Sequence, residues 1–156
     1  MKRLLLAGLL LGSAAAAQTP VMDAKTAQAI VAGCMARAGS KGQSQAVAVV
    51  DRGGHLVATV RMDRVGPGPM DFAVAKAEAA ALWGFDTAGM AEGAKEFSGF
   101  ASAPHVVTVA GGLPVYSADG RERIGAVGVS GEDPAEDAAC AQAGIAAAGL
   151  KAERAR

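Results

Sequence analysis

The 156-residue chain carries 15 lysine and arginine residues against 15 aspartate and glutamate residues, so its formal net charge is zero. Loss of an N-terminal segment with Lys2 and Arg3 would leave 13 basic and 15 acidic residues, a charge of −2. Because no basic stripe or block of like charge remains, the composition argues against nucleic acids and anionic membranes as partners. It favours a small ligand or a second copy of the chain.

Residues 1–17 have the pattern of a secretory signal peptide. A charged start at Lys2 and Arg3 precedes an apolar run over residues 4–11, and small residues follow at Ala15 and Ala17. The apolar run is too short for a membrane span. We expect cleavage after Ala17, which would leave residues 18–156 as a single periplasmic or secreted domain.

Small and apolar residues recur at offsets of three and four between residues 27 and 38. This spacing predicts a helix that ends near Gly39. Residues 46–51 and 55–61 are two runs rich in β-branched residues joined by Arg52-Gly53-Gly54, which predicts a tight antiparallel hairpin.

Alternation along the second strand of this hairpin separates two faces. We expect one face to carry Leu56, Ala58, Val60 and Met62 and the other to carry His55, Val57, Thr59, Arg61 and Asp63. The polar side chains would then share one side of the sheet.

A glycine- and proline-rich loop at residues 65–69 precedes a second predicted helix, from Pro69 to about Trp83. Lys76 interrupts its apolar stripe, four residues from both Phe72 and Ala80. A lysine in that position requires a partner.

The remaining elements are a short helix at residues 90–97 and three strands at residues 105–109, 113–116 and 124–130. Gly111-Gly112 would form the turn between the first two of these strands. Asp133 as a cap, Pro134 in the first turn and Glu136 then open a final helix that runs to about Leu150.

This order of elements predicts an α+β fold with a five-stranded antiparallel sheet. Terminal helices packed side by side would bring Cys34 near Cys140, and an exported pair of cysteines favours a disulfide. It would close a loop of about 100 residues, for which chain entropy predicts roughly 4.7 kcal/mol of stabilisation.

Four separated blocks together resemble the GlcG/HbpS family of haem-binding and uptake-related proteins, which includes the domain fused to some PduO-type corrinoid adenosyltransferases. The blocks are VAVVDRGGHLVATVRMD (residues 47–63), AVAKAEAA, GGLPVYSADGRERIGAVGVSG and EDAACAQAG. The resemblance spans about residues 22–149 and implies a profilin-like α/β/α sandwich that forms symmetric homo-oligomers. It also implies reversible haem or iron binding in some members.

Several residues are candidates for a ligand site. His55 could ligate haem iron, or be a turn histidine that bonds nearby backbone, and it could share a metal site with His105. Arg61 and Lys76 could hold a carboxylate or haem propionate beside Asp63 in one open hollow. Equally, Lys76 could pair internally with Asp51 or Asp63.

Gly111 and Gly112 permit the close approach of a ligand, a helix or a second subunit, and Ser130 ends the last glycine-rich strand. We count all three as candidate ligand-binding residues. Met62 has the chemistry of an axial haem ligand, although core packing is the commoner role of methionine.

Three functions follow. The first is an exported, oligomeric small-ligand binder that takes haem or iron reversibly for uptake or sensing. The second is a cofactor-free periplasmic accessory or assembly module. The third is a small-molecule enzyme that uses Lys76 as a buried amine with a lowered pKa.

Overall fold

The computed structural model describes residues 20–156, and the predicted signal peptide at residues 1–17 lies outside them. Within the described residues, four α-helices, a short 3-10 helix and four strands follow one another along the chain. In chain order they are α1 (Ala24–Ser40), β1 (Ala46–Asp51), β2 (Leu56–Arg61), α2 (Pro67–Trp83), α3 (Thr87–Glu96), η1 (Phe100–Ser102), β3 (Gly112–Tyr116), β4 (Arg123–Ser130) and α4 (Pro134–Ala147).

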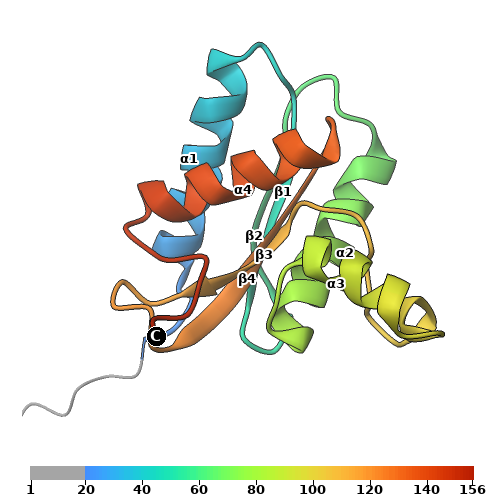
Figure 1. Ribbon diagram of the computed structural model, residues 1–156. Coiled ribbons are helices and arrows are strands. Elements are labelled where there is room, and N and C mark those ends of the chain that lie inside the picture. The colour runs from blue at the N-terminus through green and yellow to red at the C-terminus, as the bar shows by residue number, and fades with distance from the viewer. Residues whose placement is uncertain (1–19) are drawn as a thin grey trace, which may run out of the picture.

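The strands form one antiparallel sheet in the order β2-β1-β4-β3. Helices α1 and α4 pack together on one face of the sheet, and α2 covers the other face (Figure 1). The predicted α+β class is therefore confirmed. No helix within residues 20–156 has the length and apolar content required to cross a membrane.

The sheet of the described residues has four strands, so the predicted fifth strand at residues 105–109 is wrong. His105 has a left-handed backbone, with φ of 59°, and the valine-rich segment after it forms no ladder with a neighbouring strand. The predicted turn at Gly111-Gly112 is also wrong, because Gly112 already begins β3. Residues 105–109 have a high propensity for β-structure, but no neighbouring strand among the described residues pairs with them.

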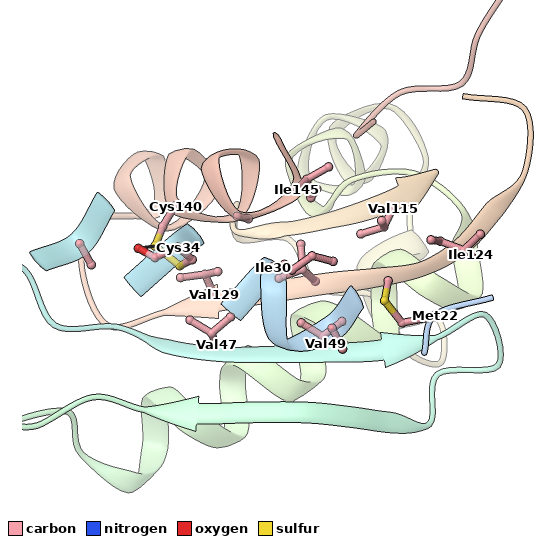
Figure 2. Close-up of a cluster of buried hydrophobic side chains, with 14 residues drawn as sticks. Met22, Ile30, Cys34, Val47, Val49, Val115, Ile124, Val129, Cys140 and Ile145 are labelled. Atoms are coloured by element: carbon pink, nitrogen blue, oxygen red, sulfur yellow. Dashed lines mark hydrogen bonds between the residues drawn. A yellow bond between two sulfur atoms is a disulfide. The ribbon is translucent and has the colours of Figure 1, made fainter. Parts of the chain in front are cut away.

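Valines of β1 and β4 meet α1 and α4 in the larger of two cores (Figure 2). Cys34 of α1 and Cys140 of α4 form a disulfide in this layer, with their Cα atoms 4.7 Å apart. The predicted pairing of the two cysteines is thus confirmed. It joins the first and last helices through two cysteines that are 106 residues apart in sequence.

On the opposite face, α2 lies directly against backbone of the sheet. A Cβ atom added to Gly128 would lie 2.0 Å from the carbonyl oxygen of Ala73, and one added to Gly112 would lie 2.4 Å from that of Lys76. Both distances are shorter than any allowed contact, so the missing side chains let α2 approach. For these glycines, close helix packing is the observed role.

A β-bulge between Val49 and Val50 changes the faces predicted for the start of β2. Leu56 pairs with Val50 and therefore shares the α2 side of the sheet, whereas Val57 packs into the core under α1 and α4. The predicted assignment of these two residues is reversed. Beyond the bulge, Thr59 and Arg61 face the α2 side as alternation requires.

Candidate functional site

Lys76 is sealed between the two helical layers, with 1% of its surface exposed. Its ammonium donates to Asp137 Oδ2 over 2.9 Å and to the carbonyl oxygen of Val129 over 3.0 Å. The internal-pair interpretation is therefore right, but the partner is Asp137 of α4, rather than Asp51 or Asp63. This ion pair ties α2 to α4 past the end of the sheet.

Asp137 accepts further hydrogen bonds besides the one from Lys76. Its Oδ1 accepts from the backbone N–H of Glu132 over 3.1 Å and, with the Gln45 amide nitrogen facing it, from that side chain over 2.9 Å. Burial raises the pKa of Asp137 above its usual value, although the Lys76 ammonium opposes that shift. We call Lys76, Asp137, Gln45 and the Val129 carbonyl the lysine network.

The expectation that Lys76 and Arg61 share one open hollow is wrong. The Arg61 guanidinium donates to the carbonyl oxygen of Val65 and so fastens the loop before α2. Asp63 lines a different, shallow hollow beside Ser44 and Arg64. Since Lys76 is buried and bonded, it is not placed as a reactive amine either.

The glycine candidates lie around the lysine network. A Cβ on Gly111 would lie 2.8 Å from Lys76 Nζ, and Gly112 donates its backbone N–H to the buried Thr87 hydroxyl over 3.0 Å. Ser130 is buried, and its carbonyl oxygen accepts from Gln45 over 3.3 Å. These three residues therefore surround a closed structural network.

His55 is in a different position, on the exposed turn between β1 and β2. Its side chain is 83% exposed, and its Nδ1 lies 3.2 Å from each carboxylate oxygen of Asp51. Asp51 also accepts the backbone N–H groups of His55 and Gly53, over 3.0 and 2.8 Å. The carboxylate thus orients both the turn and the imidazole.

The pKa of Asp51 reflects this arrangement. Partial burial acts to raise it, but hydrogen bonds from the His55 and Gly53 backbone and from the His55 ring outweigh burial and hold it below its usual value. Asp51 is therefore an ionised acceptor at neutral pH. An ionised acceptor next to Nδ1 favours the Nδ1–H tautomer of His55, in which Nε2 carries the free lone pair.

His105 is exposed on the loop that leads to β3. Within residues 20–156, no three His, Cys, Asp or Glu side chains gather into a group that could hold a metal ion. The proposed pairing of His55 with His105 thus finds no third ligand in the described part of one chain. Met62 packs beside the core and its sulfur accepts from the backbone N–H of Gln45, which supports the packing role.

Sequence reasoning missed a hollow of about 370 Å³ beside the β3–β4 turn. It is lined by Arg52, Tyr116, Arg121, Glu122, Arg123 and Arg154, and we call it the arginine pocket. Its residues come from the β1–β2 turn, the β3–β4 hairpin and the C-terminal segment. Four arginines and a single glutamate give its lining a formal charge of +3.

The end of α2 carries an exposed apolar group close to this region. Trp83 packs edge-to-face on Phe85 and Phe100, with ring centroids 6.4 and 5.2 Å apart. Trp83 Nε1 also donates to the carbonyl oxygen of Pro104 over 3.1 Å. Trp83 is the only tryptophan of the chain and directly precedes Gly84. The Arg123 guanidinium packs against Gly84, so the aromatic group lies next to the arginine pocket.

Comparisons with known proteins agree with this architecture. A family model described as haem degrading protein HbpS-like matches residues 22–146. Protein GlcG of Escherichia coli K12 is 39% identical over 111 residues, which cover 70% of this chain and 81% of GlcG.

Solved structures share the fold. A double mutant of Streptomyces reticuli HbpS superposes with a TM-score of 0.75 at 27% identity, covering 91% of this chain and 97% of that one. A PduOC–haem complex gives a TM-score of 0.79 at 24% identity and covers 86% and 100%. The match of the family model over most of the chain, together with the identity to GlcG, shows that this protein belongs to the HbpS-like family.

Proposed function

We propose that this protein is exported and binds haem reversibly, in a role linked to haem uptake or sensing. Two relationships support haem as the ligand: the HbpS-like family is described as haem-degrading, and PduOC, which shares the fold, was crystallised with haem. The observation in this chain that carries the proposal is the pairing of His55 with Asp51.

The donor set at His55 suits haem iron. An imidazole that donates its Nδ1–H to a carboxylate keeps the Nε2 lone pair available for the iron. His55 is exposed, so a planar ligand could reach it without unfolding the chain. Bound haem would supply the redox-active iron, while Asp51 and His55 would position it.

Apolar side chains next to His55 suit the porphyrin ring. Leu56 follows it in sequence and is 52% exposed, and Leu82 of α2 is 45% exposed. Leu82 lies against the same turn, because a Cβ on Gly54 would be 3.6 Å from its side chain. Covering these leucines with a flat apolar ligand would remove their surface from water.

Titration with haem, followed at the Soret band, tests the proposal. Wild type is expected to shift the band, and His55→Ala is expected to weaken binding by at least about tenfold, since an iron–nitrogen bond is lost. His105→Ala, a second exposed histidine, is the matched control and should bind as wild type. Unaltered binding in His55→Ala, or equal losses in both variants, would remove His55 from the site.

A second candidate, a cofactor-free assembly module, is favoured by the exposed apolar side chains of Trp83, Phe85 and Phe97. Exposed apolar side chains of this size are typical of a contact surface between protein copies. Light scattering of Phe97→Glu distinguishes the two functions. Loss of assembly with haem binding retained would place contact between copies on this surface, separate from the haem site.

A further inference from the structure

The arginine pocket is open and its cations lack strong partners. Arg52 Nη1 is 4.0 Å from Glu122, and Arg121 Nε is 3.9 Å from Asp119, so both contacts are at the outer limit of an ion pair. Within residues 20–156, Arg123 and Arg154 form no ion pair with any acidic group. A chain with equal numbers of basic and acidic residues thus concentrates unneutralised positive charge in one hollow.

Arg123 adds an unsatisfied donor to the pocket. Its Nε is buried and has no hydrogen-bond partner among the described residues. The guanidinium is held against α2, because a Cβ on Gly84 would lie 2.0 Å from Arg123 Nη1. A buried N–H without an acceptor costs free energy that an incoming anion could recover.

The pocket is also preorganised by backbone contacts. The C-terminal segment pairs with β3 through Lys151 and Tyr116, and Ala155 donates to the Gly120 carbonyl oxygen over 2.9 Å (Figure 1). These bonds hold the segment that carries Arg154 against the β3–β4 turn. Asp119 orders that turn by accepting from the Ser117 hydroxyl and the Arg121 N–H over 2.5 and 3.1 Å.

We propose that the arginine pocket binds an organic anion through two or more carboxylate groups. Guanidinium groups form paired N–H···O bonds with a planar carboxylate, and several of them around one hollow favour a ligand with more than one charge. Such carboxylates could belong to a small polycarboxylic acid or to the propionates of a porphyrin. Only the porphyrin source rests on the proposed haem-binding function.

Calorimetric titration of the full chain with citrate, protoporphyrin and inorganic phosphate separates these sources. Protoporphyrin keeps both propionates but lacks iron, so its binding does not require His55. Binding of citrate or protoporphyrin that weakens as salt is added supports the proposal, and the ligand that binds identifies the source. Binding of phosphate alone, or of none of the three, overturns it.

The variant Arg121→Gln/Arg154→Gln removes two exposed cations from the pocket and leaves the packed Arg123 in place. It is expected to weaken carboxylate binding by at least about tenfold. Arg64→Gln/Arg156→Gln changes the net charge equally outside the pocket and should bind as wild type. Equal losses in the two double variants would show a general charge effect and overturn the proposal.

The two proposals fail separately. If protoporphyrin binding is lost in Arg121→Gln/Arg154→Gln but retained in His55→Ala, the arginine pocket binds carboxylates independently of His55. If haem binding is lost in His55→Ala while no carboxylate responds to the pocket variant, haem binding stands and the pocket proposal is wrong.

Discussion

The lysine network and the arginine pocket use similar chemistry to different ends. Lys76 is buried and its ammonium meets a carboxylate and a carbonyl oxygen at normal hydrogen-bond distances. In the arginine pocket, Arg52 and Arg121 are exposed, and the carboxylates of Glu122 and Asp119 lie 4.0 and 3.9 Å from them. The cation of the lysine network has its acceptors within the protein, whereas the arginine pocket has N–H donors without acceptors among the described residues.

This difference distinguishes a charged side chain that stabilises the fold from charged side chains that remain available to bind a ligand. A buried cation without a partner is strongly destabilising, so Asp137 stabilises the fold by pairing with Lys76. An exposed arginine needs no partner for folding, and loses little when none is present. Whether the donors of a buried or exposed cation already have acceptors within the protein therefore indicates its function better than its residue type does.

The largest expected effect comes from breaking the lysine network. Lys76→Met keeps most of the side-chain volume but leaves Asp137 buried without its cation, and should lower the free energy of unfolding by about 3–5 kcal/mol. Urea denaturation measures this loss. Lys76→Met/Asp137→Leu removes both charges and should recover part of it; a single variant as stable as wild type would show that the pair is unimportant.

The disulfide between α1 and α4 should come next. Cys34→Ala/Cys140→Ala is expected to cost about 2–4 kcal/mol, because it frees the unfolded chain from a long closed loop. Denaturation of wild type under oxidising and reducing conditions provides the control. Equal stability of the oxidised and reduced forms would contradict a stabilising role for this bond.

The arginine pocket should contribute little to stability, in contrast to the lysine network. Arg121→Gln/Arg154→Gln is expected to change the free energy of unfolding by less than about 0.5 kcal/mol, as is usual for exposed side chains. Thermal melting without ligand checks this. A loss comparable to that of Lys76→Met would mean that the pocket is a structural element as well.

The smallest effect concerns Glu136, which joins α4 to α1 at the surface. Hydrogen bonds from Lys41 and then Arg37 lower its pKa to about 2. Because the folded pKa lies below the ordinary value of 4.5, its stabilising contribution is present above pH 4.5 and is lost as the pH falls toward 2. The difference in free energy of unfolding between wild type and Glu136→Gln should therefore become smaller as the pH falls from 4.5 toward 2. A difference that stays constant over this range would contradict a stabilising role for the Glu136 carboxylate.

Local patterns in the sequence were sufficient for most elements of the fold. Apolar spacing located α1, the Gly53-Gly54 turn located the hairpin, and the Asp133 cap located the start of α4, where its carboxylate accepts from Ala135 N–H. Propensity failed at residues 105–109, because β-branched residues form a strand only where another strand lies alongside.

The site was less accessible to sequence reasoning. The position of Lys76 within an apolar stripe showed that it needs a partner, but Asp137 lies 61 residues away and only the tertiary fold brings them together. The arginine pocket draws on three separate segments. Its one local signal was the Arg121-Glu122-Arg123 run, which has the appearance of an ordinary polar turn.

The structure of the haem-soaked protein tests the central claim most directly. With haem bound, we expect the iron on Nε2 of His55, the ring against Leu56 and Leu82, and the Asp51 hydrogen bond retained. Iron ligated by a different residue, or no haem at His55 under saturating conditions, would contradict the proposed site.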